Sequence, residues 1–318
     1  MRILVTGGGG FIGQEIIKLL VKTGQHDVIA VDQSLTALEN IQAKQGEQAK
    51  NIEIIEGNIS QKDVLTQAFA GGVDAVIHLA VVPGGAAEEN PELAWSINIE
   101  ATRMLIDMAA QSGSNPRFIF ASTIAVFGNE KPSLIDDNTP LSPYMFYGAH
   151  KSMMEQWLAL QSRRGLVNGL SMRLPGIVAR PKLASGMKSA FMSNVFHALM
   201  ANEAFVCPVS AETTMWFMSV QSVAKNFCHA LELDTNALPE SRTLTLPALR
   251  LNMDMLVSGL YSLLDIKEKL VTYVADAELE RGFGGYPVLV TKTADELGFK
   301  NDGDIETLIR NVLGSLSK

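Results

Sequence analysis

The stretch that decides the fold of this 318-residue chain is Thr6-Gly7-Gly8-Gly9-Gly10-Phe11-Ile12-Gly13. It follows a short apolar run over residues 3–6 and precedes residues 12–22, whose apolar side chains recur at helical spacing. Gly7, Gly10 and Gly13 form a G-x-x-G-x-x-G pattern, in which the chain turns tightly, approaches a pyrophosphate and packs a helix closely on a strand. A glycine run also occurs in plain flexible turns, but its place between the first strand and the first helix favours a dinucleotide-binding loop.

The first half of the chain alternates short apolar runs with longer segments of helical periodicity. The predicted strands are residues 3–6, 28–32, 52–56, 75–79 and 117–121. The predicted helices are residues 12–22, 35–43, 62–70 and 91–111. This alternation predicts an α/β fold in which a parallel sheet is covered by helices on both faces. With right-handed crossovers, the sheet becomes the doubly wound sheet of a Rossmann fold.

The regular alternation of predicted strands and helices ends after about residue 144. The elements expected there are a helix over 143–164, a strand over 170–174, an irregular loop over 175–186, helices over 188–201 and 220–233, a strand over 243–246 and a helix over 305–316. We expect residues 1–172, with a return segment of about 215–247, to form the dinucleotide-binding domain. Residues 173–214 and 248–318 are expected to form a smaller substrate-binding lobe.

Composition and charge argue against several classes of function. The chain is 47% hydrophobic, which suffices for a large core, and its net charge of −8 is a poor match for nucleic acid. No apolar run approaches the ~18 residues of a membrane span, and glycines cut the first run too short for a signal peptide. We therefore expect a cytoplasmic protein with no membrane partner. Cys207 and Cys228 form no Cys/His cluster, so neither a disulfide nor a metal site is expected.

Asp32 ends the second predicted strand and indicates which dinucleotide binds. A carboxylate at this position accepts hydrogen bonds from the adenosine ribose of NAD and repels the 2′-phosphate of NADP. Gln33 and Ser34 supply no arginine of the kind that an NADP site needs. NAD is therefore the predicted cofactor. The alternative is that Asp32 caps the next helix or closes a turn.

Tyr147 and Lys151 lie four residues apart, on one face of a predicted helix. The pKa of free tyrosine, about 10, is too high for a base at neutral pH, and a nearby ammonium lowers it. Ordinary surface pairs share this spacing, so the context matters. Ser122 and Thr123 end a buried strand, where ligands of a doubly wound sheet bind, and their hydroxyls suit a substrate oxygen. The alternative is that these hydroxyls cap the next turn.

As an ordered set, these motifs resemble the extended short-chain dehydrogenase/reductases, the NAD-dependent epimerase/dehydratase family, over nearly the whole chain. The matching strings are TGGGGFIG, Asp32, Gly57-Asn58-Ile59, His78-Leu79-Ala80, Asn98-Ile99-Glu100-Ala101-Thr102, STIAVFG and YGAHK. The resemblance implies that Thr123, Tyr147 and Lys151 are catalytic, with Tyr147 as the base and Lys151 also binding the ribose. It implies further that Asn98 props the active-site helix.

The resemblance also implies a set of cofactor contacts. The implied residues are Gly7, Gly10, Phe11, Ile12, Gly13, Asp32, Asn58, Ile59, Leu79, Ala80, Val81, Ser122, Tyr147, Lys151 and Pro175. Asn58 departs from the family, which usually has an aspartate near the adenine, and His78 is interpreted as a structural residue at a strand end. Family members pair through helices that correspond to residues 91–111 and 143–164, so a homodimer is expected.

Two departures bear on the substrate. Most members of the family act on nucleotide-diphosphate sugars and carry an asparagine where this chain has Gly176, and an Arg-Asp pair where it has Met215 and Trp216. A buried diphosphate without that arginine would be poorly compensated. Trp216 itself either walls off a compact pocket or packs in the core.

The segment from Arg173 to Pro181 is most similar to the branch of this family that oxidises D-erythronate, as are Leu141-Ser142-Pro143 and Cys207-Pro208-Val209. This similarity implies NAD-dependent oxidation of a four-carbon sugar acid at its C2 hydroxyl, which gives the 2-oxo acid. The substrate carboxylate needs a cation, for which Arg180 is the candidate, unless it forms an ordinary ion pair. The alternatives are a nucleotide-sugar epimerase or dehydratase and a non-catalytic dinucleotide sensor, although a sensor has no use for the catalytic residues.

Overall fold

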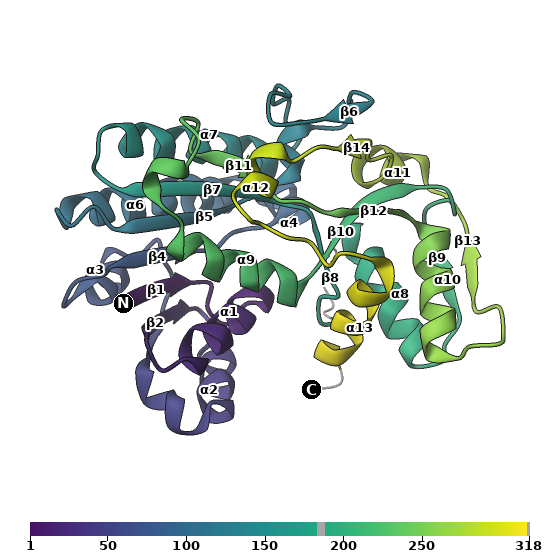
Figure 1. Cartoon of the computed structure of the whole chain (residues 1–318), viewed down its shortest axis with the longest axis horizontal. Helices are drawn as coiled ribbons and strands as arrows, with labels where there is room; N and C mark the ends of the chain where they lie inside the picture. The colour runs from purple at the N-terminus through teal and green to yellow at the C-terminus, as the bar shows by residue number, and fades with distance from the viewer. Residues whose placement is uncertain (183–187, 317–318) are drawn as a thin grey trace.

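The computed structural model describes residues 1–182 and 188–316 (Figure 1). Its largest sheet has seven parallel strands in the order β11-β7-β5-β4-β1-β2-β3. The strands are β1 (Arg2–Thr6), β2 (Asp27–Asp32), β3 (Ile52–Glu56), β4 (Ala75–His78), β5 (Arg117–Thr123), β7 (Asn168–Leu174) and β11 (Thr243–Thr245). The chain starts near the middle of the sheet and winds outward in both directions. The predicted doubly wound fold is therefore confirmed.

Helices cover both faces of this sheet. The helices on one face are α1 (Phe11–Lys22), α2 (Leu35–Lys44) and α9 (Val220–Glu232), and those on the other are α3 (Lys62–Phe69), α6 (Thr102–Gln111) and α7 (Phe146–Arg163). Successive strand residues point to opposite faces, so in β1 Ile3 and Val5 join one core cluster and Leu4 joins the other. Burial on both faces explains why the middle residues of β1, β2 and β4 are all apolar.

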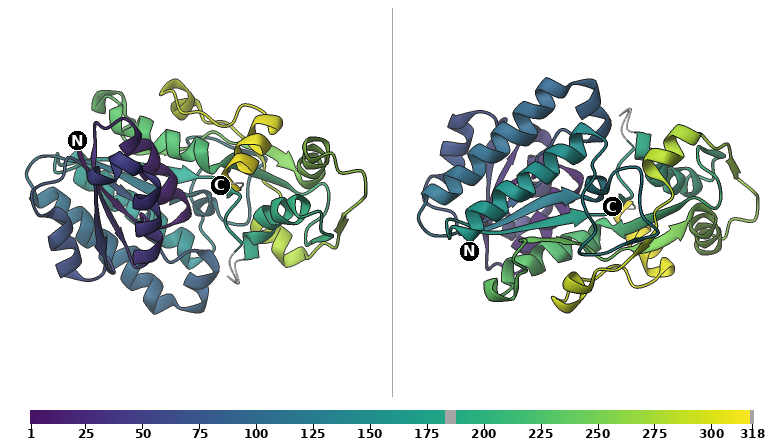
Figure 2. Two further views of the ribbon diagram at one scale, coloured as in Figure 1. Left: turned by 90° about the horizontal axis from the view of Figure 1, so that it is seen from below. Right: turned by 90° about the horizontal axis from the view of Figure 1, so that it is seen from above.

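The second lobe is built around the three-stranded sheet β12-β10-β8. Its strands are β8 (Gly176–Val178), β10 (Thr214–Ser219) and β12 (Leu249–Asn252), and its long helices are α8 (Phe191–Met200), α10 (Met253–Leu264) and α13 (Ile305–Leu316). Smaller elements complete it, namely β6 (Leu134–Ile135), β9 (Phe205–Cys207), β13 (Val271–Tyr273), α11 (Ala277–Phe283) and β14 (Val288–Leu289). The short α12 (Lys292–Glu296) packs instead against β11 of the large sheet. Figure 2 shows this lobe beside the seven-stranded sheet. Along the chain, α9 and β11 lie between segments of the second lobe and return to the large sheet.

Three expectations about the elements were wrong. The helix expected over 91–111 is divided into α5 (Pro91–Trp95), a π-helical segment (Ser96–Ala101) and α6, and a short α4 (Gly84–Glu89) precedes it. Part of the loop expected over 175–186 forms β8, because these residues pair with β10, and residues 183–186 of it lie outside the described residues. The helix expected from residue 143 begins at Phe146, because Met145 is still extended. No helix in the described ranges is long and apolar enough to cross a membrane.

Candidate active site

A cavity of about 580 Å³ opens at the carboxyl ends of the parallel strands and extends to residues of the second lobe. The predicted site residues that line it are Gly7, Gly10, Phe11, Ile12, Gly13, Asp32, Asn58, Ile59, Leu79, Ala80, Val81, Ser122, Thr123, Tyr147, Lys151, Pro175 and Arg180. Asn98 is the one predicted site residue outside this lining. The structure therefore brings the two halves of the predicted site, for cofactor and for substrate, into one cavity.

The glycine loop fits a pyrophosphate because side chains have no room there. Gly7 has a φ of +70°, and a Cβ on it would lie 2.8 Å from the main-chain nitrogen of Ala80. A Cβ on Gly13 would collide with the carbonyl oxygen of Gly7, so α1 can start close to β1 only with glycine here. The loop is held to β2 by the N–H of Gly7, which donates to the carbonyl of Val31 at 2.8 Å. No side chain of the described residues caps α1, so its first amides point to the cavity edge as a phosphate site requires.

Asp32 joins the glycine loop to the end of β2. Its Oδ2 accepts a hydrogen bond from the N–H of Gly9 at 3.0 Å, and its Oδ1 accepts one from the N–H of Ser34 at 3.0 Å. The cap of α2 is Ser34, whose hydroxyl accepts from the N–H of Ala37. Asp32 thus closes the turn without capping the helix, and it also lines the cavity, where a ribose would lie.

Lys151 is almost fully buried on the side of α7 that faces β5, with an exposed fraction of 3%. Its Nζ donates to the carbonyl of Ala121 at 2.6 Å and lies 4.4 Å from the ring centre of Phe120 and 5.9 Å from that of Tyr147. Burial lowers the pKa of Lys151 to about 7, and the carboxylate of Glu155 acts in the opposite direction. Lys151 therefore lies beside Tyr147 but is only weakly basic.

Tyr147 lies near a second cation that its own helix does not supply. Burial raises the pKa of its phenol, while the charge of Arg180 and a hydrogen bond with Thr123 lower it. Arg180 comes from the segment after β8 and not from α7, so its effect on Tyr147 could not be read from local spacing. The expectation that Lys151 also lowers this pKa stays a prediction.

The two hydroxyls at the end of β5 have separate partners. The hydroxyl of Ser122 donates to Oε1 of Glu155, on α7. The hydroxyl of Thr123 bonds with Tyr147 and also accepts from the N–H of Ala125 at 3.1 Å, so it caps the following turn as well. Of these two hydroxyls, only that of Thr123 therefore lies beside Tyr147, as the sequence led us to expect.

The main chain of Arg180 is fixed at both of its polar atoms by α8. Its N–H donates to the hydroxyl of Ser193 at 3.0 Å, and its carbonyl lies 2.7 Å from Nε2 of His197. The guanidinium is half-buried at the cavity and close enough to Tyr147 to lower the pKa of the phenol. This arrangement places a cation in the part of the cavity where Tyr147 lies.

Asn98 supports a loop and not the active-site helix, which corrects the expected role. Its Oδ1 accepts from the N–H of Val82 at 2.8 Å, and its Nδ2 donates to the carbonyl of the same residue at 2.9 Å. The loop after β4, which lines the cavity, is thereby tied to the π-helical segment. His78 is fully buried between the hydroxyls of Thr6 and Thr102, in agreement with the structural role expected for it.

Several residues near the site were not found from the sequence. Phe283 and Tyr286 line the cavity from the C-terminal part of the chain, where no motif marks them. Glu155 did carry a signal, because it follows Lys151 by one helical turn on the same face of α7. Trp216 packs in the core with an exposed fraction of 1%, so it does not wall off the pocket directly, although its ring lies 4.9 Å from that of Tyr286.

Comparison with known proteins identifies the family. The model described as the NAD dependent epimerase/dehydratase family matches residues 3–241. The chain belongs to this family. It is accordingly an enzyme with a nicotinamide cofactor, and the glycine loop, which would be blocked by any Cβ, fits that group.

Two relatives align with the chain from end to end and are dehydrogenases. D-erythronate dehydrogenase from Cupriavidus necator is 32% identical over 98% of this chain and 97% of its own length. D-erythronate dehydrogenase from Haemophilus influenzae is 31% identical over 98% of this chain and 99% of its own length. These likenesses show that the chain is a dehydrogenase of the family.

Solved structures agree with the fold. A nucleoside-diphosphate-sugar epimerase from Agrobacterium tumefaciens superposes with a TM-score of 0.87 at 26% identity, over 100% of this chain and 95% of that one. An L-threonine dehydrogenase from Cupriavidus necator superposes with a TM-score of 0.86 at 20% identity, over 99% of this chain and 100% of that one. The second likeness bears on the fold alone.

Proposed function

We propose that this protein oxidises the C2 hydroxyl of D-erythronate, or of a closely related small sugar acid, to the 2-oxo acid with NAD as the acceptor. The observation that supports this most directly is the position of Arg180 in the cavity with Tyr147 and Thr123. In a 2-hydroxy acid the carboxylate is bonded to the reacting carbon. The cation that binds it must therefore lie close to the catalytic base, and Arg180 does.

The proposed reaction uses three side chains of this protein. Thr123 holds the substrate hydroxyl beside Tyr147, and the phenolate of Tyr147 removes the hydroxyl proton. Lys151 stabilises the phenolate by its charge. The nicotinamide supplies the acceptor for the hydride that leaves C2. Arg180 holds the carboxylate by two parallel hydrogen bonds and so fixes which carbon faces the acceptor.

Asp32 supports NAD over NADP. Its carboxylate lies at the cavity edge and is held by two main-chain N–H groups. It therefore cannot turn away readily to admit a 2′-phosphate, which it would repel.

The nucleotide-sugar alternative receives less support from the second lobe. Met215 and Trp216 stand where most sugar-nucleotide enzymes have an Arg-Asp pair, and each has an exposed fraction of 1% in the core. Neither offers a charge to a diphosphate.

The direct test follows NADH formation with purified protein, NAD and a panel of acids that includes D-erythronate and L-threonate. Nucleotide sugars run in parallel, and Tyr147→Phe is the control. We expect NAD reduction by a four-carbon acid and loss of that activity in the variant. Conversion of a nucleotide sugar without net NADH, together with no turnover of any acid, would refute the proposal and support the epimerase alternative.

A further inference from the structure

The side of α7 that faces β5 carries a third polar residue beyond Tyr147 and Lys151. Glu155 follows Lys151 by four residues, as Lys151 follows Tyr147, so the three side chains lie in a row along one side of the helix. Each member of the row bonds to one of the last three residues of β5. These pairs are Tyr147 with the hydroxyl of Thr123, Lys151 with the carbonyl of Ala121, and Glu155 with the hydroxyl of Ser122.

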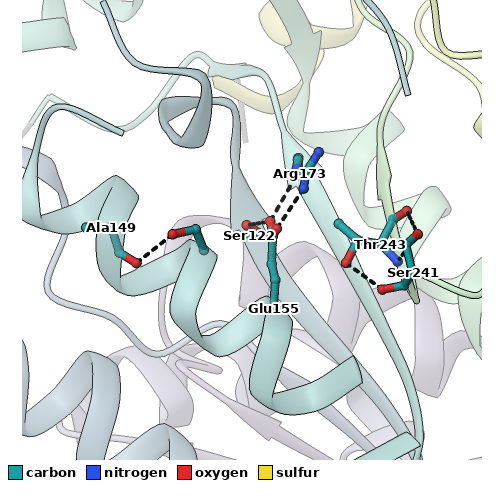
Figure 3. Close-up of polar contacts among 7 residues, drawn as sticks. Ser122, Ala149, Glu155, Arg173, Ser241 and Thr243 are labelled. Atoms are coloured by element: carbon teal, nitrogen blue, oxygen red, sulfur yellow. Dashed lines mark hydrogen bonds and ion pairs between the residues drawn. The ribbon is translucent and has the colours of Figure 1, made fainter. Parts of the chain in front are cut away.

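Glu155 is fully buried, with an exposed fraction of 0%, and its carboxylate is held from two strands. Arg173 on β7 donates from Nε to Oε1 at 3.0 Å and from Nη2 to Oε2 at 2.8 Å, while Ser122 on β5 donates to Oε1. Ser122 and Arg173 are direct neighbours in the parallel ladder, so both reach the same carboxylate, as Figure 3 shows. Such bonding compensates a buried charge and fixes its position.

We propose that Glu155 is a positioning residue whose fixed negative charge keeps the side chain of Lys151 positively charged beside Tyr147. The proposal rests on the roles proposed above for Tyr147 and Lys151. Glu155 does not line the cavity, so the proposed effect on the reaction passes through Lys151. If Glu155 served only to hold α7 against the sheet, an uncharged side chain that kept its hydrogen bonds could replace it, whereas the proposed role needs the negative charge.

The groups around Lys151 support this assignment. Burial lowers the pKa of Lys151 to about 7, and Glu155 is the neighbour that raises it. His78 on β4 is neutral, because burial and the charge of Lys151 both lower its pKa. Arg173 on β7 is paired with Glu155, and the aromatic ring of Phe120 faces Nζ from β5. Without the carboxylate, Lys151 would be largely neutral at pH 7 and would no longer stabilise the phenolate.

The test is Glu155→Gln, which keeps the size of the side chain and an oxygen that accepts from Ser122 and Arg173. We expect the pKa of Lys151, measured by carbon NMR of lysine-labelled protein and assigned with Lys151→Met, to fall by about one pH unit or more. We expect the acid limb of kcat/KM against pH to move to higher pH, since a neutral lysine leaves the pKa of Tyr147 higher. The exposed Glu240→Gln removes the same charge far from the site and should change neither result.

The NMR titration uses no substrate, so its outcome does not depend on the proposed sugar acid. Absence of turnover with every acid, with the lysine shift still present, would refute the substrate and leave the role of Glu155 intact. A folded Glu155→Gln protein with the lysine pKa of the wild type would overturn the role. If Glu155→Gln does not fold, Glu155→Asp is the second variant, because its side chain is one methylene shorter and moves the carboxylate away from Lys151. A lysine pKa equal to that of the wild type in this variant would also overturn the proposal.

Discussion

Tyr147 is subject to opposing influences, and their balance decides the pH at which it could serve as the proposed base. Its burial raises the pKa of the phenol, whereas Arg180 and Thr123 lower it. Lys151, with a pKa of about 7, adds its charge only below or near neutral pH. The charged and polar groups around Tyr147 therefore come from three separate segments of the chain, of which only Lys151 shares its helix.

The double role of Arg180 gives a prediction at this scale. Arg180→Met removes the fork that binds a carboxylate, so we expect the KM for the sugar acid to rise roughly ten- to hundredfold. The variant also removes a cation that lowers the pKa of Tyr147, so the acid limb of kcat/KM should move to higher pH. Steady-state kinetics over a pH series measures both effects. A raised KM with an unmoved acid limb would show that Arg180 binds substrate without influencing Tyr147.

Asp32 gives a second prediction. Asp32→Asn keeps an oxygen for one main-chain N–H but removes the charge that repels a 2′-phosphate. We expect the ratio of kcat/KM with NAD to kcat/KM with NADP to fall by roughly tenfold or more. Asp27→Asn, at the exposed start of the same strand, is the matched control and should leave the ratio unchanged. An equal ratio in the Asp32 variant and the wild type would contradict the assigned discrimination.

The residues of the cavity were largely predictable from the sequence because their spacing follows from local geometry. The glycine loop, Asp32 and the pair Tyr147 and Lys151 each sit at a strand end or on one helix face. The partners of these residues were less predictable. That Arg180 faces Tyr147, or that Asn98 bonds to Val82, depends on how distant segments fold over the sheet, and no local pattern encodes it.

Helix α7 approaches the end of β5 closely at one glycine. Gly148 follows Tyr147 directly, and a Cβ on it would lie 2.5 Å from the carbonyl oxygen of Ala125. The helix can therefore lie against the turn after β5 only while this position has no side chain. This contact determines how far Tyr147 stands from Thr123.

Gly148→Ala tests this contact. We expect the free energy of unfolding to fall by about 1–3 kcal/mol through overpacking, in spite of the better helix propensity of alanine. We also expect kcat to fall, because α7 must move away from Thr123. Thermal unfolding measures the change in stability, and steady-state kinetics measures the change in kcat. Gly314→Ala is the control, because a Cβ at that position has open space around it. If Gly148→Ala left stability and kcat as unchanged as Gly314→Ala does, the close approach would be contradicted.

The elements of the first lobe were predictable because strands buried on both faces form continuous apolar runs. The elements of the second lobe were harder to predict from the sequence, and α10 shows the reason. Its sequence has a capping residue, Asn252, but also Gly259 in its middle, which weakens a local helix signal. The glycine is there for a long-range contact, since a Cβ would lie 2.7 Å from Cδ1 of Ile309 on α13. Strands β8, β10 and β12 likewise depend on pairing between distant segments.

The whole molecule is organised around the cavity that both lobes line. The chain leaves the parallel sheet after β7, forms β8 to β10 in the second lobe and returns through α9 and β11. Helix α7, with Tyr147 and Lys151, belongs to the first lobe, while Arg180 follows β8 and Tyr286 precedes β14. The cavity is thus lined from both lobes, and the chain crosses between these lobes more than once.

One face of the molecule gives the last prediction. Helices α5 and α7 expose large apolar side chains, among them Trp95 at 44% and Met153 at 46%. Because such side chains are usually covered when they gather on neighbouring helices, we propose that two copies of the chain pair through these helices about a twofold axis. Light scattering after gel filtration should then give twice the chain mass of 34.4 kDa. Met153→Glu should shift the protein to monomer, whereas Met255→Glu, an equally exposed position on α10, should not. A monomeric wild type, or dissociation by both variants alike, would contradict this interface.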